Sequence, residues 1–579
     1  MRIRPEKKWG LVPLCLLMLL ALAHATLPHT LRYLKSGSPV YFADSDDTDL
    51  YLNYSSHAFH HGGLALKDPI TDSVGTFVPD TQLMPFVLAA KFLGLHPTHI
   101  PILWRIWAGI SLALTVFLLL RLLIGSAWAA SLSGAILLTD AGFLSASPFL
   151  RQVQVALQLA GENSESLLSI FPQIHLQWRI ITPGLSLGVL LLQITFILSA
   201  RKQEGHARIA LAALATGALF YVYFYFWTAA LLALGLCFLV DRSARALYAK
   251  ITVLGFIIGA PALFMSAALK KNSHPEALPR LDFFLPIDRF SEFLIPKAAI
   301  ATIFLTWILL LKLPNNRFPK NIFYYPAALA LSALLLLNHQ TLTGLQIQNF
   351  HYSYVYGPIG YISLLAIGAR LLISLMGERK VIIGLALTSI ITIPIGFYTR
   401  AIESNKTKES IALLDAYHIA KALAEGAAIP ISSDIIAGDI KIASQLSIQR
   451  GLRPYAGMML SLSPKISDQE WNDRLSKNSA IQGMSRASFQ KEQEAAALHY
   501  PWGKWGRDEA LRHKLFDDRI ASFDGSMQNL LTTIDEGKIR WIVASRNVPS
   551  LWSEFFDNKN FRIAAEKNDW LLIERLTNF

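Results

Sequence analysis

Residues 100–120 read IPILWRIWAGISLALTVFLLL, a run in which Arg105 is the only charged side chain. The hydrocarbon core of a bilayer is about 30 Å thick, and a helix needs about 20 apolar residues to cross it. This run therefore predicts a membrane-spanning helix. Similar runs occur at residues 11–27, 128–146, 180–200, 251–269, 297–311, 322–338, 354–376 and 381–398.

The composition of the 579-residue chain agrees with this interpretation. Apolar residues make up 53% of it and charged residues 16%, whereas soluble proteins average roughly 25% charged residues. Residues 208–240 are too long for one span, so we divide them at the aromatic patch 221–227, because aromatic residues favour a membrane interface. The sequence thus predicts an integral membrane protein with about eleven spans.

The basic residues indicate how these spans are oriented. Short cytoplasmic loops carry an excess of Lys and Arg, and with eleven spans the basic segments fall on one side. The segments predicted outside the cytoplasm are 28–99, 147–179, 270–296, 339–353 and everything after about 399. This topology requires residues 82–95 to lie along the membrane instead of crossing it.

The N-terminal span has a second interpretation. Its basic start, its short apolar core and Ala23-His24-Ala25 also fit a cleavable signal peptide. We favour a retained span, because ten further spans need no signal peptide. In either case the loop that follows lies outside the cytoplasm.

The chain divides into two parts by composition. Residues 1–398 form the transmembrane domain, and residues 399–579 read as a soluble extracytoplasmic domain. Helical periodicity at 410–424 and short apolar runs at 428–432, 540–544 and 570–573 predict a mixed α/β fold for that second domain. The predicted fold class is mainly α, a polytopic helix bundle with a C-terminal α/β domain, in the inner or plasma membrane of the cell.

Two classes of protein are excluded. Cys15 and Cys237 both lie in apolar runs, so neither a disulfide framework nor a cysteine metal cluster is expected. The net charge is +12, but the basic residues cluster between apolar runs, where they act as topology signals. We therefore expect no nucleic-acid partner.

The first external loop carries a concentrated group of carboxylates. Residues 41–51 read YFADSDDTDLY, with Asp44, Asp46, Asp47 and Asp49 inside six residues. Such carboxylates repel one another unless a cation or a proton-transfer task holds them. The alternative is a solvated acidic turn.

The order of motifs around this loop resembles a known family. After the acidic run come a proline-led stretch at 79–86 and then Trp104-Arg105 at the outer end of the next span. This order is similar to the N-terminal part of the GT-C glycosyltransferases, particularly the protein O-mannosyltransferase and lipid A aminoarabinose transferase branch. The resemblance covers about residues 10–150; beyond them only the pattern of spans and the terminal external domain agree.

The family's acidic pair can be matched in two registers. That pair is usually Asp-Glu, with an aromatic residue four positions after the Asp. Asp47 has Tyr51 at that position but Thr48 beside it, whereas Asp46-Asp47 supplies a pair with Leu50 at the aromatic position. Both registers stay open.

The resemblance implies transfer of a sugar from a polyprenyl-phosphate donor to an acceptor hydroxyl outside the cytoplasm. The first-loop Asp of the family acts as the base, so the resemblance assigns that role to Asp47, with Asp46 as the substitute. A general base contributes about 10²–10⁴ in rate. The acceptor is a lipid, a protein or a glycan.

The departing phosphate calls for a cation near the outer membrane surface. Arg179 and His351 rank first, because each sits where a polar loop meets a span beside aromatic residues, and Arg105 and Arg151 are further candidates. Tyr51, Trp178 and Tyr352 are candidates for contact with the sugar, the alternative being ordinary interface anchors. Lys270, Lys271, Arg280 and Arg289 are weaker candidates for the phosphate.

Three histidines suggest a metal site only weakly. His57, His60 and His61 have helical spacing that places them on one face, but Gly62-Gly63 predicts a helix end, where histidines are common without metal. We therefore predict no metal site here. Some family members use a divalent ion, which is the one cofactor that the resemblance leaves open.

Two other functions compete with the transferase. A transporter or flippase would show related halves or charges inside its spans, whereas this sequence has no internal repeat and its carboxylates cluster in an outer loop. A membrane scaffold would bind a cell-envelope partner through residues 400–579 and would tolerate replacement of the aspartates.

Overall fold

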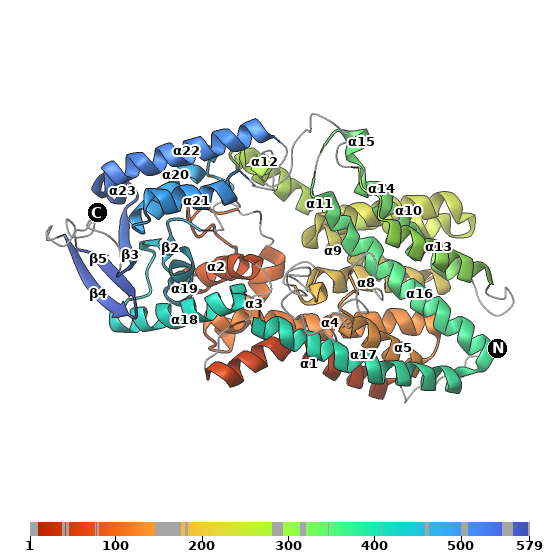
Figure 1. Ribbon diagram of the computed structural model, residues 1–579. Helices are drawn as coiled ribbons and strands as arrows, with labels where there is room; N and C mark the ends of the chain where they lie inside the picture. The colour runs from red at the N-terminus through yellow and green to blue at the C-terminus, as the bar shows by residue number, and fades with distance from the viewer. Residues whose placement is uncertain are drawn as a thin grey trace.

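We describe the protein from a computed structural model. The described residues are 10–37, 41, 46–75, 77, 80–144, 175–179, 183–280, 293–312, 320–345, 347–406, 408–457, 463–498, 508–546 and 560–576. Apolar helices and a smaller α/β part lie at opposite ends of an elongated molecule (Figure 1).

A helix lies at each of the eleven positions predicted for spans. They are α1 (Leu11–Ser36), α4 (Ile100–Ile124), α5 (Ala127–Thr139), α8 (Ser186–Lys202), α9 (His206–Val222), α10 (Phe224–Val240), α11 (Arg245–Asn272), α13 (Lys297–Lys312), α14 (Tyr324–Leu337), α16 (Ser353–Met376) and α17 (Glu378–Lys406). Five candidate spans, at 11–36, 97–124, 242–272, 353–376 and 378–403, are long and apolar enough to cross a membrane. Length and composition alone therefore support five of the spans.

The long apolar stretch 208–240 is interrupted inside its aromatic patch, as predicted. Tyr223 has an extended backbone, with φ −160°, and separates α9 from α10. Phe220 and Trp227 stack across this break with ring centroids 4.5 Å apart. The break leaves Tyr223 at the junction of two helices, where its side chain meets the loop before α16.

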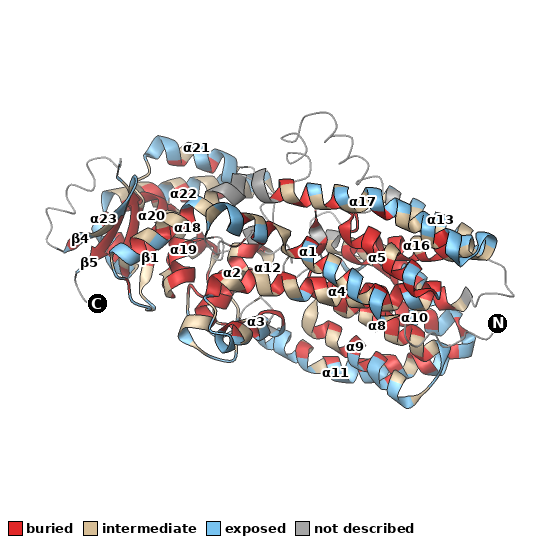
Figure 2. Ribbon diagram, turned by 90° about the horizontal axis from the view of Figure 1, so that it is seen from below, coloured by how far each residue is buried: buried red, intermediate tan, exposed pale blue. Residues whose placement is uncertain are grey.

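Small residues let the helices pack closely. A side chain at Gly109 of α4 would approach the Leu22 Cα of α1 to 3.1 Å, and one at Gly255 of α11 would press on Thr216 of α9. On the opposite faces, large apolar side chains such as Phe256, Phe304 and Ile391 are exposed. Figure 2 shows these pale-blue faces along α11, α13 and α17. An apolar exterior on packed helices indicates a lipid environment.

The first loop folds into two helices, α2 (Asp46–His61) and α3 (Asp80–Phe92), followed by the short η1 (Pro97–His99). The 13 residues of α3 extend about 20 Å, less than the hydrocarbon thickness. This helix is anchored to the α9–α10 junction, because Thr81 Oγ1 donates to the Tyr221 carbonyl at 2.6 Å. Most of the stretch 82–95 therefore belongs to the short helix α3, which ends at Phe92.

The C-terminal part is α/β, as predicted. Its strands are β1 (Ile435–Gly438), β2 (Arg453–Pro454), β3 (Ile539–Ser545), β4 (Phe561–Lys567) and β5 (Trp570–Arg575), in the order β2-β1-β3-β5-β4. The strands β2, β1 and β3 are parallel, and β5 and β4 are antiparallel. The helices are α18 (Lys408–Gly426), α19 (Ile440–Arg450), α20 (Asp468–Ile481), α21 (Arg486–Ala496), α22 (Glu509–Gln528) and α23 (Leu530–Glu536).

The predicted elements of this part are partly correct. The helix at 410–424 and the strands at 540–544 and 570–573 are confirmed as α18, β3 and β5. The strand predicted at 428–432 is wrong: Ala428 has a positive φ of 49°, which turns the chain after α18, and the strand begins at Ile435. The prediction missed β4, whose outward face is polar.

Candidate functional site

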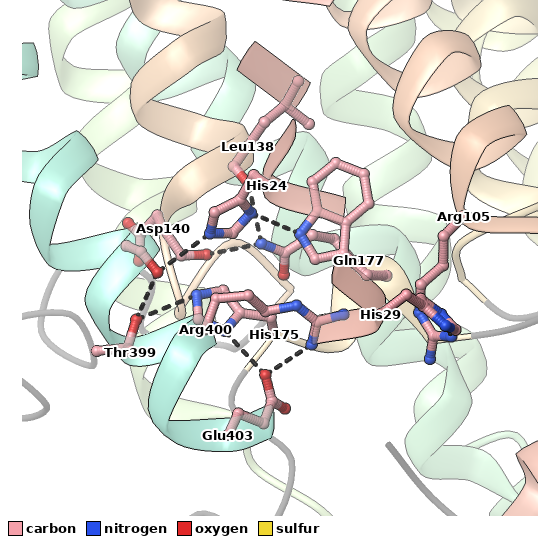
Figure 3. Close-up of polar contacts among 12 residues, drawn as sticks. His24, His29, Arg105, Leu138, Asp140, His175, Gln177, Thr399, Arg400 and Glu403 are labelled. Atoms are coloured by element: carbon pink, nitrogen blue, oxygen red, sulfur yellow. Dashed lines mark hydrogen bonds and ion pairs between the residues drawn. The ribbon is translucent and has the colours of Figure 1, made fainter. Parts of the chain in front are cut away.

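A buried polar network holds the short segment 175–179 against the apolar helices (Figure 3). The Trp178 indole, which is fully buried, donates from Nε1 to His24 Nδ1 at 2.9 Å. His24 Nε2 lies 3.1 Å from the Gly396 carbonyl. Because Nδ1 accepts and Nε2 donates, His24 is a neutral imidazole that ties this segment to α1 and α17.

An ionic group forms the other half of the network. Glu403 Oε2 lies 2.6 Å from Arg400 Nη1 and 3.2 Å from His175 Nδ1, and all three side chains are buried. His175 Nε2 also lies 3.3 Å from Thr399 Oγ1. The charges of Arg400 and Glu403 compensate each other inside the protein, as a buried pair requires.

Two further contacts fix the course of this segment. Gln177 Nε2 donates to the Leu138 and Asp140 carbonyls, at 3.1 and 3.2 Å. A side chain at position 184 would overlap the Arg179 carbonyl oxygen, which the Gly184 amide binds at 2.9 Å. These contacts hold the backbone from which the Arg179 side chain extends.

The Arg179 side chain lies beside a cluster of aromatic side chains at the start of α16. Its Nη1 lies 3.4 Å from the Tyr354 hydroxyl. The His351 ring is 5.5 Å from the Tyr354 ring and stacks on Tyr225 at 5.0 Å, and the Tyr223 hydroxyl is hydrogen-bonded to His351 Nδ1. Arg179 and His351, which were predicted separately from distant segments, thus lie in one cluster, and both are only half-buried.

The environment of His351 determines what it can do. Burial, and then the nearby positive charge of Arg179, lower the pKa of His351 to about 3. At neutral pH the ring is uncharged, so it can donate or accept a hydrogen bond but supplies no positive charge. Arg179 is the cation of this cluster.

Tyr51 connects the first loop to this cluster. Burial raises the pKa of Tyr51 to about 12, and the Tyr354 hydroxyl adds to the shift, so the two phenols lie close together. Asp47 precedes Tyr51 by four residues on α2, and positions four apart lie on the same face of a helix. Asp47 and Tyr51 therefore belong to the same face of α2.

Tyr41, which precedes α2, is held by contacts from two other segments. Arg32 Nη1 donates to the Tyr41 carbonyl at 2.7 Å, and Gln445 Nε2 of α19 donates to the Tyr41 hydroxyl at 2.6 Å. That hydroxyl donates to Asp49 Oδ1. Asp49 is thus a structural carboxylate, whereas the backbone of Asp46 and Asp47 begins α2 and their side chains lie outside the described part of the chain.

The other predicted residues are placed differently. Arg105 is fully buried, with Nη1 2.6 Å from His29 Nε2, and it supports the end of α1. The buried Tyr352 hydroxyl lies 3.1 Å from Thr228 Oγ1, and the fully buried Trp178 has no ring face open to a sugar. Arg280 is also buried and bonds to the Ile466 carbonyl at 2.5 Å. Arg151 and Arg289 lie outside the described residues.

The three histidines of α2 point to different acceptors. His57 Nε2 lies 3.1 Å from Asp72 Oδ1, His60 Nε2 lies 2.9 Å from the Ile448 carbonyl, and His61 Nε2 lies 2.7 Å from the Gly451 carbonyl. Among the residues that the structure describes, no group of three potential ligands could hold a metal ion. His60 and His61 join α2 to α19 and the turn after it, whereas His57 bonds within the first loop.

Comparison with solved structures identifies the architecture. ArnT from Cupriavidus metallidurans matches with a TM-score of 0.51 when bound to undecaprenyl phosphate and 0.52 in its apo state, at 11% and 12% sequence identity. Each match covers 98% of this chain and 98% of that one. The chain has the GT-C fold.

The GT-C fold was expected from the motif order of residues 10–150, and that expectation is confirmed. A further structure, the mycobacterial arabinofuranosyltransferase AftD, matches at a TM-score of 0.47 and 10% identity, over 99% of this chain and 40% of that one. No protein-family model and no curated protein sequence matches the chain.

Several residues of the site were missed from the sequence. Arg32, which donates to the Tyr41 carbonyl, and Arg400, which pairs with Glu403, are two of them. Arg400 lies near Tyr398, where the last span meets a polar segment. Arg179 was predicted from the same pattern, an arginine near an aromatic residue at the junction of a loop and a span. His24 and His29 gave no such signal, because a lone histidine in an apolar helix is ordinarily a packing residue.

Proposed function

We propose that this protein is a membrane glycosyltransferase that moves a sugar from a polyprenyl-phosphate donor to an acceptor hydroxyl on the extracytoplasmic side. The observation that carries the proposal is the convergence of Arg179, His351 and Tyr51 beside the start of α2. The fold supports it, because ArnT, which shares that fold, has been solved with undecaprenyl phosphate bound.

Arg179 is the residue that we assign to the donor phosphate. A guanidinium group binds phosphate oxygens through two parallel hydrogen bonds, and negative charge develops on the phosphate as the sugar leaves. Arg179 is half-buried and held by its segment, so it can reach a ligand without losing its position. His351 adds a neutral hydrogen bond.

Asp47 is the residue that we assign to proton removal, with Asp46 as the substitute. Oxygen attack on the anomeric carbon releases a proton from the acceptor hydroxyl, and a carboxylate can take it in the same step. Tyr51, four positions further on α2, interacts electrostatically with Tyr354, whose hydroxyl lies 3.4 Å from Arg179 Nη1. The base and the phosphate ligand would thus flank the donor sugar.

In this proposal the polyprenyl chain of the donor lies against the apolar exterior of the helices. Exposed side chains of α11, α13 and α17 make these faces suited to hydrocarbon, and a polyprenyl chain can lie there while its phosphate reaches Arg179. In this proposal the eleven helices span the inner or plasma membrane, and residues 399–579 lie outside the cytoplasm. The proposal includes no cofactor, and a divalent ion stays the one that the family resemblance leaves open.

Replacement of the assigned base tests the function. We expect Asp47→Asn to lower sugar transfer from a polyprenyl-phosphate donor by at least about 100-fold, within the range for loss of a general base, while the membrane yield stays unchanged. The measurement is transfer of radiolabelled sugar by the purified protein in nanodiscs. Asp517→Asn, on the exposed face of α22, is the matched control. Full activity of both Asp46→Asn and Asp47→Asn would exclude this mechanism.

A further inference from the structure

The C-terminal part contains a cavity that the proposed transferase site does not use. It has a volume of about 480 Å³ and lies where β1 and β3 begin, against α20 and the turn from α23 to β3. The first loop contributes Ile70 to its wall. Cavities that bind small ligands measure roughly 300–1,000 Å³, so this one is large enough for a ligand.

Charges of both signs line the cavity in nearly equal number. Four side chains are cationic and three are carboxylates: Arg453, Arg474, Lys477, Lys538, Glu470, Asp473 and Glu536. Two pairs are already formed, because Arg474 Nη2 lies 2.8 Å from Glu470 Oε1 and Lys477 Nζ lies 3.7 Å from Glu536 Oε2. A simple anion would meet the carboxylates, and a simple cation would meet the bases, so neither fits the whole lining.

Other polar groups of the lining have hydrogen-bonding capacity to spare. Arg453 donates from Nη2 to the Ile70 carbonyl at 2.6 Å, but its buried Nε has no hydrogen-bond partner among the described residues. Among the residues that the structure describes, the side chains of Asp473 and Gln469, which also line the cavity, have no hydrogen bond or ion pair. Gln469, Asp473 and Lys477 recur every four residues on α20, so donors and acceptors form one stripe along the cavity.

The backbone at the rim is held in an unusual conformation. Lys538 has a positive φ of 48° without being glycine, and it follows Gly537, whose replacement would press a side chain on Tyr455 at 3.0 Å. Strained positions of this kind collect at ligand sites. The turn places the exposed Lys538 at the rim of the cavity.

We propose that this cavity binds an uncharged sugar residue of a glycan. Each sugar hydroxyl both donates and accepts hydrogen bonds, so neighbouring hydroxyls can bond to a carboxylate and a guanidinium group at once. Ile70, Ile435 and Tyr455 supply the apolar part of the lining, and the seven charged side chains around them disfavour a lipid chain. This inference concerns binding at this cavity and stands whether or not the protein transfers sugar.

Direct binding to the full-length protein tests the inference. Mannobiose, galactobiose and arabinobiose are titrated into protein in nanodiscs, free of sugar-based detergents, and saturation-transfer NMR detects the bound disaccharide. We expect at least one of them to bind, and Asp473→Ala and Gln469→Ala each to weaken binding by at least about tenfold. Asp517→Ala, on the exposed face of α22, is the matched control and should bind as the unmodified protein does.

Three results would overturn the inference. One is the failure of all three neutral disaccharides to bind. Another is unchanged binding by both Asp473→Ala and Gln469→Ala, with melting temperatures like that of the unmodified protein, which would place the sugar elsewhere. The third is selective binding of glucosamine, galacturonate or tetra-alanine, which would assign the cavity to a charged sugar or a peptide.

Discussion

Neighbouring residues of the segment 175–179 have opposite tasks. Trp178 is fully buried and donates to His24, whereas Arg179 reaches Tyr354 and remains half-buried. The sequence predicted that both lie at the junction of a loop and a span. That position alone could not show which of them packs in the interior and which could bind a ligand. The separation depends on contacts with α1 and α16, which are distant in the sequence.

We predict that sugar transfer depends on the side chain of Arg179. We expect Arg179→Ala to lower kcat/KM for the polyprenyl-phosphate donor by at least about 100-fold, since a lost donor at a developing charge costs about 10²–10³. Arg179→Lys should recover part of the rate, because it keeps the charge without the bidentate geometry. Arg208→Ala, in the first turn of α9, serves as the control. A rate within threefold of the unmodified protein for Arg179→Ala would remove this residue from the mechanism.

Among the elements, α2 links the two parts of the chain. Its Asn53 Nδ2 donates to Ser444 Oγ of α19 at 2.8 Å, and His60 and His61 bond to carbonyls of α19 and the residue after it. Apolar run length and helical spacing predicted α2 and the helices around it. The partner of α2 could not be predicted, because Ser444 lies almost four hundred residues away and no local pattern encodes that contact.

The histidines at this junction make the stability of the protein depend on pH. Burial is the main cause that lowers the pKa values of His57 and His60, and it lowers that of His96 to about 4. The unfolded chain therefore binds more protons than the folded one below pH 6.5, and stability falls as the pH falls from about 6.5 towards 4. We expect the melting temperature to decrease over this range. His96→Asn, which keeps an acceptor at the start of η1, should reduce that decrease.

Scanning fluorimetry between pH 7.5 and 4.5 measures this effect. The matched control is His206→Asn at the exposed start of α9, which should keep the pH dependence of the unmodified protein. Identical profiles for His96→Asn and the unmodified protein would show that this histidine does not contribute.

Across the whole molecule, the site is assembled from parts that the sequence separates widely. Arg179 precedes α8, His351 and Tyr354 flank the start of α16, and Tyr51 belongs to the first loop. The C-terminal part fixes that loop through Gln445 and Tyr41. The motif order predicted the fold and pointed to the candidate site. Which of two neighbours, such as Trp178 and Arg179, is available to a ligand depends on burial. Burial depends on the complete fold, so it could not be predicted from the local sequence.

A covalent link between the two parts tests whether this arrangement is the active one. We expect Asn53→Cys with Ser444→Cys, in a chain with Cys15 and Cys237 changed to alanine, to be cross-linked by dibromobimane and to keep most of its transfer activity. The matched pair Asn53→Cys with Asp517→Cys should not be cross-linked. Loss of activity on cross-linking of the first pair would show that α2 and α19 must separate during catalysis.

In the proposed mechanism a lipid-linked donor binds beside Arg179 and His351, within reach of α2. Electron cryomicroscopy of the protein in nanodiscs with undecaprenyl phosphate measures this directly. We expect phosphate density within hydrogen-bonding distance of the Arg179 guanidinium group, with the polyprenyl chain running along the apolar helices. Phosphate density bound away from both Arg179 and α2 would contradict it.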